Sequence, residues 1–525
     1  MERRGFLKAG AAALVMPSVS RAASRSVLRM VPQSDLGSID PHWSSDGVAR
    51  NHGFLIYDTL YGLSLDLSPS PQMAAGAVEE DDGRVVTITL REGLLFHDGE
   101  PVRATDCVAS ILRWSKRNPF GQKLASVIDE LSAVDDHRLR FRLRRRFPML
   151  INALAVTTQP PVIMPERVAQ TDPFKQITET IGSGPFRFRR DEFLSGSRVV
   201  YDRNPAYRPR ETGAASLTAG PKQVLFERLE WLIIPDGATA AAALRNGEID
   251  WIEQSNPDQQ EALRADNAIS VEPLGPFPSV CIMRLNFLQP PFNDKAVRRA
   301  ILAVIAQDDF MVPIAGDDPS AWWRCGAFLP ASQMATQAGL EVLDGPRSSV
   351  RAREILAAAG YTGQVARVIA PTDKFVPAQL GLVSADALRR TGLNVDFAVS
   401  DWGTLLQRRS GREPVEKGGW SAFSTNLPGL DCADPAGHIA LRGNGTGPGS
   451  FAGWPTLPRL EELRDAWFDA PNIAAQKAIC IEIQHVVMDE VAFVPLGANA
   501  VVTAIRRDLA DRKIGMALFW GMHRV

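Results

Sequence analysis

The 525-residue chain is poor in the side chains that usually build disulfide scaffolds and metal sites. It contains only five cysteines and seven histidines, and both are widely scattered. So few cysteines allow at most two bridges, which excludes a disulfide-built scaffold, and their scatter excludes a metal knuckle. After the N-terminal region no segment stays apolar for eighteen residues, so the sequence predicts no membrane-spanning helix in the mature chain.

The charge of the chain is also unbiased. There are 58 lysines and arginines against 60 aspartates and glutamates, and 45% of the residues are hydrophobic. This composition argues against disorder, a coiled coil and a nucleic-acid or other polyanionic partner. Arginines alternate with Leu139, Phe141 and Leu143, a period-two pattern that predicts a strand with one solvated face. The alternative, an anion-binding patch, receives no support from the overall charge.

Enzyme motifs are missing as well. We find no Gly-x-Ser-x-Gly elbow, no phosphate-binding loop and no Ser-x-x-Lys motif. The glycine-rich stretch 443–449 contains Pro448 and precedes no helix, so we interpret it as a surface loop and not a dinucleotide site. We therefore expect a protein that is not an enzyme and has no cofactor. A secreted hydrolase whose site is assembled from distant loops is the open alternative.

The N-terminus has the order of an export signal. Arg3 and Arg4 precede a short apolar run, and the small residues Ser20 and Ala22 suit a cleavage site. The sequence predicts a signal peptide over 1–22 that resembles the twin-arginine type. No cysteine lies near the cut, so no lipid anchor is indicated. We expect a soluble mature protein located in the periplasm.

Residues 94–114 crowd several reactive side chains into one segment, as catalytic and metal sites do. Their spacing matches no zinc motif, whereas Asp98-Gly99 is typical of a turn and Thr105 could cap a following helix. We therefore interpret the segment as a turn feeding an amphipathic helix. The crowded residues are His97, Asp98, Glu100, Asp106 and Cys107.

The remaining pattern is α/β throughout, and about 500 mature residues suffice for two or three domains. A strand, a helix and a strand over 226–253 form a predicted parallel crossover, and Asn293 is a predicted cap for a later helix. The first strand of the mature chain runs into a polar loop, a place where α/β proteins often put ligand contacts. Within that loop we select Trp43, Ser45 and Asp46 as candidate binding residues.

Several motifs occur in the order seen in one known family. Their combination resembles the extracytoplasmic solute-binding proteins of peptide-type ABC transporters, family 5, which includes dipeptide, oligopeptide and nickel receptors. The motifs are "SIDPHWSSD", "VTITLREGLLFHDGEPVRATDCVASILRW", "GSGPFRF", "RNPAY", "AALRNGEIDW", "PPFNDKAVRRAI" and "ILAAAGY".

The resemblance implies a type II periplasmic-binding-protein fold of cluster C. Two α/β lobes would be joined by a hinge, would close on the ligand, and would carry an extra domain inserted in the first lobe. The chain would cross between the lobes near 273–278 and 495–500. The implied boundaries are 23–65, 185–274 and 497–525 for lobe I, 66–184 for the inserted domain and 275–496 for lobe II.

The implied function is capture of a peptide or another amine-bearing solute. A monomeric receptor would hold the solute between its lobes and deliver it to the permease and ATPase subunits of an ABC importer. A nickel or metal-chelate receptor of the same fold is an alternative, which the lack of clustered histidines disfavours. A receptor that feeds a signalling sensor is a further alternative.

The resemblance also assigns roles to individual residues. Asp431, four residues before Pro435, would anchor the ligand's amino group, and Trp402 would wall the pocket. Two features depart from the family pattern: an apparent insertion, "RRSGREPVEKGG", and Pro428 in place of a tryptophan. From the residues alone, Asp431 could instead cap a turn with Asp434, and Trp402 could simply pack in the core.

The resemblance further suggests a disulfide. Some peptide receptors of the family carry one in the neighbourhood of Cys281 and Cys432, and the compartment is oxidising. We therefore expect these two cysteines to pair.

Overall fold

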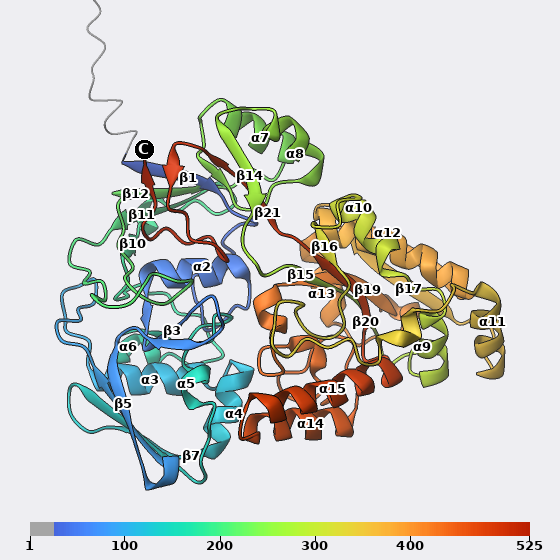
Figure 1. Cartoon of the computed structure of the whole chain (residues 1–525), viewed down its shortest axis with the longest axis horizontal. Helices are drawn as coiled ribbons and strands as arrows, with labels where there is room; N and C mark the ends of the chain where they lie inside the picture. The colour runs from blue at the N-terminus through green and yellow to red at the C-terminus, as the bar shows by residue number, and fades with distance from the viewer. Residues whose placement is uncertain (1–25) are drawn as a thin grey trace, which may run out of the picture.

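The computed structural model describes residues 26–525, so the predicted signal peptide 1–22 lies outside the described residues. The chain forms two α/β lobes, and a smaller unit extends the first of them (Figure 1). In this described part, no helix is both long and apolar enough to cross a membrane.

The first lobe is built on a seven-stranded mixed sheet with the order β10-β11-β12-β1-β13-β21-β14. Strand β1 pairs in parallel with both β12 and β13, and helix α7 (Gly237–Arg245) connects those two strands. The predicted parallel crossover is therefore confirmed, with β1 lying between its two strands. The strands are β1 (Val27–Val31), β10 (Phe186–Phe188), β11 (Arg198–Arg203), β12 (Arg228–Leu232), β13 (Trp251–Ile252), β14 (Ile269–Pro273) and β21 (Val502–Arg506).

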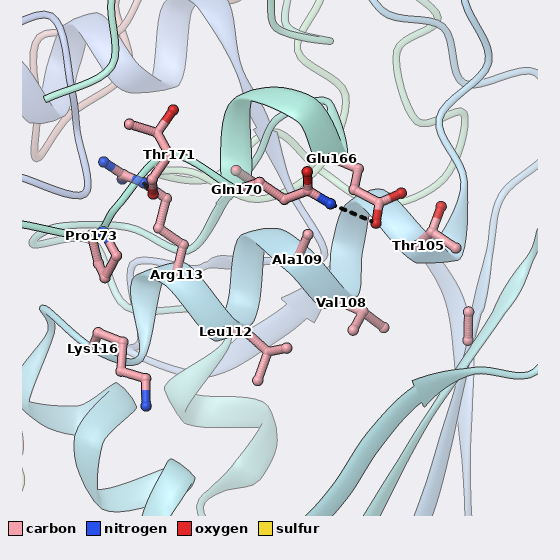
Figure 2. Close-up of a pocket in the computed structure, with 12 residues that line it drawn as sticks. Thr105, Val108, Ala109, Leu112, Arg113, Lys116, Glu166, Gln170, Thr171 and Pro173 are labelled. Carbon is pink, nitrogen blue, oxygen red and sulfur yellow. Dashed lines mark hydrogen bonds between the residues drawn. The ribbon is translucent and has the colours of Figure 1, made fainter. Parts of the chain in front are cut away.

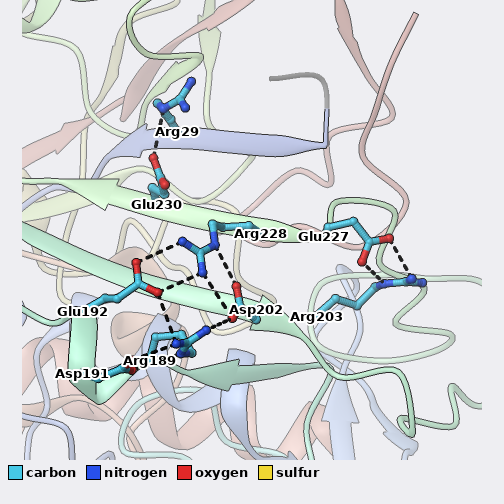
Figure 3. A network of polar contacts seen from close by, with 9 residues as sticks. All are labelled: Arg29, Arg189, Asp191, Glu192, Asp202, Arg203, Glu227, Arg228 and Glu230. Atoms are coloured by element: carbon cyan, nitrogen blue, oxygen red, sulfur yellow. Dashed lines mark hydrogen bonds and ion pairs between the residues drawn. The ribbon is translucent and has the colours of Figure 1, made fainter. Parts of the chain in front are cut away.

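Ion pairs cover part of this sheet (Figure 3). Arg228 contacts both Glu192 and Asp202, at 2.9 and 2.8 Å, and Arg189 reaches the same Asp202 at 2.5 Å. These side chains keep a quarter to a third of their surface exposed, so solvent screens the pairs and each stabilises the fold little. The network connects β11 and β12 to the loop after β10 and helps to fix their relative positions.

The smaller unit contains a four-stranded antiparallel sheet with the order β5-β6-β8-β7. Burial alternates along β8 (Arg138–Leu143): the arginines point to solvent and Leu139, Phe141 and Leu143 are buried. The predicted strand with one solvated face is therefore confirmed. The other elements are β5 (Ala74–Glu80), β6 (Val85–Leu90), β7 (Ile128–Ala133), α3 (Ala104–Trp114), α4 (Pro119–Val127), α5 (Leu150–Ala153) and α6 (Glu166–Ala169).

The crowded segment 94–114 is a turn followed by helix α3, as predicted. The His97 ring binds backbone groups: its Nε2 donates to the carbonyl of Gly184 at 3.2 Å, and the amide of Gly182 donates to its Nδ1. The predicted cap is wrong, because Arg103 and not Thr105 occupies the N-cap. The Asp106 carboxylate accepts the Arg103 amide at 2.8 Å, so the helix begins two residues earlier than a Thr105 cap would allow.

The second lobe has a six-stranded sheet with the order β16-β20-β15-β19-β17-β18. Helix α9 (Lys295–Leu302) is capped by Asp294, whose carboxylate accepts the Ala296 amide at 2.7 Å, so the predicted cap at Asn293 is one residue early. The strands are β15 (Ser279–Leu285), β16 (Trp322–Trp323), β17 (Val365–Pro371), β18 (Asn394–Ser400), β19 (Ala422–Leu427) and β20 (Val494–Asn499). The other main helices are α10 (Gln307–Ala315), α11 (Ser349–Ala358), α12 (Phe375–Thr391), α13 (Trp402–Ser410), α14 (Pro458–Asp469) and α15 (Ile473–Glu490).

Two chain segments connect the lobes. The chain leaves the first sheet after β14 and enters the second at β15, and it returns between β20 and β21. Because β14 pairs with β21 and β15 pairs with β20, the two connections run side by side (Figure 1). Two adjacent connections of this kind provide an axis about which the lobes can rotate.

The smaller unit touches the second lobe at the end far from these connections, where α4 lies beside α14 (Figure 1). Phe468 of α14 packs against Phe120 and Phe147, with ring centroids 5.2 and 6.2 Å apart. Lys123 pairs with Asp465 at 2.6 Å beside these rings. We call the three phenylalanines the aromatic seam.

Candidate functional site

Asp431 lies where the second lobe meets the rest of the molecule. It belongs to a short 3-10 helix, η5 (Gly429–Cys432), that follows strand β19. Gly429 fits tightly against a connecting segment, since a Cβ there would lie 2.2 Å from the carbonyl oxygen of Pro278. From the smaller unit, the Thr158 hydroxyl donates a hydrogen bond to the Asp431 carboxylate. Asp431 is therefore bound across the boundary between the lobes.

The surroundings of Asp431 make its ionised form costly. Burial raises its pKa to about 6, against the opposing effects of Arg50 and of the Thr158 hydrogen bond. The neighbouring turn is capped by Asp434, which accepts the amides of Ala436 and Gly437 at 2.8 and 3.4 Å. Because Asp434 fills that role, the turn does not need the carboxylate of Asp431 as its cap.

The loop that carries Thr158 is held by the preceding helices. Asn118 donates to the Thr158 carbonyl at 3.0 Å, and the Trp114 indole donates to the Gln159 carbonyl at 2.7 Å. Gln159 in turn donates to the Trp43 carbonyl at 3.3 Å. The end of α3, the Thr158 loop and the polar loop after β1 thus form one connected support for the site.

The first lobe contributes a buried carboxylate that the sequence analysis did not select. Glu253, which is 1% exposed, accepts the Gln33 amide at 2.8 Å and the Asn51 side-chain amide at 3.1 Å. Burial raises its pKa. Lys374 of the second lobe donates to the Gln33 carbonyl of the first lobe at 3.3 Å. In the sequence, the one sign that Glu253 is a candidate site residue is its position directly after strand β13.

The three candidates from the polar loop have different surroundings. Trp43 is half-buried, with the guanidinium of Arg117 4.3 Å from its ring centroid. Ser45 is exposed. Asp46 is exposed and caps helix α2 (Gly47–Ile56), where it accepts the Val48 amide at 3.4 Å. The same carboxylate acts electrostatically on Glu253 and contributes to raising the pKa of that residue.

Trp402 is the first residue of helix α13. Its backbone amide donates to Asp373 at 2.8 Å, and its half-buried side chain packs against a hydrophobic cluster that includes residues of the smaller unit and of the second lobe. The hydrogen bonds that connect Asp431, the Thr158 loop and the loop of Trp43 do not involve Trp402.

The predicted disulfide is absent from the structure. Cys281 and Cys432 are both buried free thiols, and burial raises the pKa of each. The Cys281 thiol instead donates to the side chain of Asn499 at 3.4 Å. The structure therefore contradicts the pairing, because both cysteines are free and the Cys281 thiol is bonded to Asn499.

An open pocket of about 400 Å³ lies elsewhere, on the smaller unit between α3 and α6 (Figure 2). Its wall is largely apolar, and the guanidinium of Arg113 in its lining is already bound to Asp40 at 2.7 Å. Within residues 26–525, no three His, Cys, Asp or Glu side chains are grouped so that they could hold a metal ion. The polar groups between the lobes are therefore the better candidate for solute recognition.

Comparison with solved structures defines the fold. The fold matches DppA, an ABC transporter-associated periplasmic binding protein from Helicobacter pylori solved with the peptide STSA, at a TM-score of 0.78 and 20% identity, over 96% of this chain and 99% of that one. It also matches MoaA of A. tumefaciens R10, solved with mannopinic acid, at a TM-score of 0.79 and 20% identity, over 95% and 99%. The predicted type II periplasmic-binding-protein fold is confirmed.

Sequence comparison then defines the family. The model of the bacterial extracellular solute-binding proteins, family 5, matches residues 68–430. A protein from Sinorhizobium fredii, described as the probable peptide ABC transporter periplasmic-binding protein y4tO, is 33% identical over 100% of this chain and 99% of its own length. The chain belongs to family 5 of the bacterial extracellular solute-binding proteins, as the sequence motifs predicted.

The aromatic seam gives a test of lobe closure. Rotation about the two connections must separate Phe468 from Phe120 and Phe147, so Phe468→Ala should favour an open form. Truncating a buried phenylalanine typically costs about 3–5 kcal/mol. This value is an upper bound for the change in the free energy difference between the closed and the open form. We expect a larger radius of gyration by small-angle scattering and weaker solute binding, because fewer molecules occupy the closed form.

Leu194→Ala is the control for this prediction, since Leu194 is 62% exposed. It should change neither the scattering nor the binding. An unchanged radius of gyration in Phe468→Ala would mean that the seam does not hold the lobes together.

Proposed function

We propose that this protein is the extracytoplasmic receptor of an ABC importer and captures a peptide or another amine-bearing small solute between its lobes. Family membership supports the receptor role. The observation that carries the choice of solute is the Asp431 carboxylate, which lies between the lobes and is not needed by its own turn. Trp402, Trp43, Ser45 and Asp46 are proposed to complete the binding surface. The peptide solved with DppA and the description of the Sinorhizobium protein as a probable peptide-binding component agree with this solute class.

Binding, delivery and release follow from the two-lobed fold. The solute's ammonium group replaces the Thr158 hydroxyl at Asp431, and rotation about the connections encloses it. The closed monomer then presents both lobes to the permease, whose ATPase subunits drive import. Release requires the lobes to separate, which moves Asp431 away from Thr158 and the rest of the first lobe.

A screen of peptides and small amines against the purified protein tests the function. A bound solute at 100 times its dissociation constant should stabilise the native state by about 2.7 kcal/mol, visible as a rise in melting temperature. A hydrolase would instead convert its ligands, which mass spectrometry of the screened mixtures would detect. A screen that yields turnover products and no stable complex would refute the receptor function.

We also propose export by the twin-arginine route into the periplasm. Arg3 and Arg4 followed by a short apolar run support this route. Changing both to lysine should keep the precursor in the cytoplasm while the mature domain still folds, as cell fractionation would show. Normal export of the double variant would contradict the twin-arginine assignment.

A further inference from the structure

Helix α3 carries apolar side chains on two of its sides. One side faces the core of the smaller unit through Cys107, Ile111 and Trp114, each 1% exposed or less. A second stripe consists of Val108 and Leu112, one helical turn apart, and Leu112 is 44% exposed. The outer side of a surface helix is usually polar, so this second stripe indicates a face that a ligand or partner covers.

This stripe lines the pocket of about 400 Å³ between α3 and α6 (Figure 2). Ala133 at the end of β7 and Ala169 of α6 contribute further apolar lining. Small-molecule sites typically enclose about 300–1,000 Å³, so the pocket is large enough for one small ligand. Its α3 wall extends from Thr105 to Lys116, about 16 Å at a rise of about 1.5 Å per residue. The pocket therefore has the length to hold an extended chain.

The charged groups of the pocket already have partners, with one exception. Arg113 is paired with Asp40 at 2.7 Å, and Gln170 donates to Glu166 at 3.1 Å (Figure 2). The exposed Lys116 lies at one end of the apolar stripe, and within residues 26–525 its ammonium group has no hydrogen bond or ion pair. A ligand of this pocket would therefore meet hydrocarbon along α3 and one free positive charge at the end of that helix.

We propose that the pocket binds a free single-chain carboxylic acid in its ionised form, with the chain along α3 and the carboxylate at Lys116. The charges are complementary, and the apolar wall suits a hydrocarbon chain. A peptide segment fits less well, because its backbone amides would lose water without gaining partners here. A membrane surface also fits less well, since such sites typically gather about four to eight lysines and arginines. The site is distinct from the solute site between the lobes, so the inference goes beyond the proposed function.

Hexanoate, octanoate and decanoate are the probes, titrated into the mature protein and followed by ligand-observed NMR. Affinity should rise with chain length, by at most about fourfold for each CH₂ group that is buried. Wild type should also bind octanoate about two- to fivefold more tightly than neutral octanamide, the range expected of an exposed ion pair. Lys116→Gln should lose this preference while it still binds both probes.

Leu112→Asp tests the apolar wall. It places a charge beside the chain and should weaken octanoate binding by about tenfold or more. Leu194→Asp, at a site 62% exposed in the first lobe, and Lys417→Gln, at an exposed site in the second, are the matched controls and should bind like wild type. The melting temperature of each variant reports whether it is folded. The Lys116→Gln comparison decides the question even if Leu112→Asp does not fold.

Several results would overturn the inference. One is the absence of binding, or binding that does not depend on chain length. Octanoate binding that persists in folded Leu112→Asp would place the acid elsewhere, and equal affinity of wild type for octanoate and octanamide would remove the role of Lys116. Flotation with phosphatidylglycerol vesicles that retains wild type but not Leu112→Asp would identify a membrane surface as the occupant instead. None of these results bears on peptide binding between the lobes.

Discussion

Asp431→Asn should weaken an amine-bearing solute by a factor of about thirty or more. The substitution keeps the shape of the side chain and removes its charge, so the buried ammonium group of the solute loses its counter-ion. Removing one partner of a buried, hydrogen-bonded charge pair typically costs about 2–5 kcal/mol, largely because the other charge is left unpaired. Titration calorimetry with the solute identified in the screen would measure this loss.

Two controls sharpen the result. A solute with an acetylated amino group should be rejected by wild type, and Asp431→Asn should have lost that preference. Asp386→Asn changes an exposed carboxylate of the same lobe, 64% exposed, and should bind normally. If wild type binds free and acetylated solutes equally, Asp431 does not recognise an amine.

The pH dependence of binding should identify the same group. Asp431 must be ionised to hold an ammonium ion, and burial raises its pKa to about 6 in the empty protein. Affinity for an amine should therefore fall about tenfold for each pH unit below 6 in wild type and stay flat through this range in Asp431→Asn.

The pKa shift also predicts a difference in stability. A carboxyl group whose pKa is higher in the folded than in the unfolded state makes folding less favourable as the pH rises through those two values. Above pH 6 the empty Asp431→Asn protein should consequently melt no lower than wild type. A clearly lower melting temperature at pH 7 would mean that the charged form supports the fold.

Asp40→Asn should destabilise the protein by about 3–5 kcal/mol, because it breaks a buried salt bridge on one side only. Both carboxylate oxygens of Asp40 accept from Arg113, at 2.7 and 3.2 Å, and the two side chains are 1% exposed or less. Asp40 also accepts the amides of Trp43 and Ile177 at 3.3 and 3.1 Å. The variant leaves the guanidinium charge buried without a counter-ion.

Urea denaturation of the mature protein would show this as a lower midpoint. Asp129→Asn removes a partner of an exposed pair with Arg142, both about half exposed, and should change the midpoint little. The double variant Asp40→Asn with Arg113→Met should recover much of the loss, since no charge is then left buried alone and the asparagine oxygen still accepts backbone amides. An unchanged midpoint in Asp40→Asn would mean that the pair does not support the fold. We also expect weaker solute binding in Asp40→Asn, because the Trp43 loop loses an anchor.

Much of the local structure could be predicted from the sequence. The turn and helix of segment 94–114 follow from Asp98-Gly99 and from apolar residues at helical spacing, and the alternation around Leu139 predicts β8. These patterns depend on residues close together in the chain. The errors in the predicted helix caps are also local. The observed caps are Arg103 and Asp294, whereas the sequence predicted Thr105 and Asn293, one or two positions away.

The composition of the site could be predicted only in part. Asp431 was selected from the family resemblance. The residues around it left open whether it instead caps a turn with Asp434. Glu253 was not selected, because a glutamate after a strand has no local feature that marks it as buried. In the structure it lies against the loop after β1 and helix α2, whose Gln33 and Asn51 donate to it.

The sequence by itself determined the family, the α/β class and most of the helices and strands, because spacing, capping and motif order act over short distances. Only the tertiary structure decided which distant groups meet. Asp40 and Arg113 are 73 residues apart, and Thr158 and Asp431 are 273 apart. Contacts of that range depend on how the sheets are ordered and how the lobes rotate on their two connections, which no local pattern of side chains specifies.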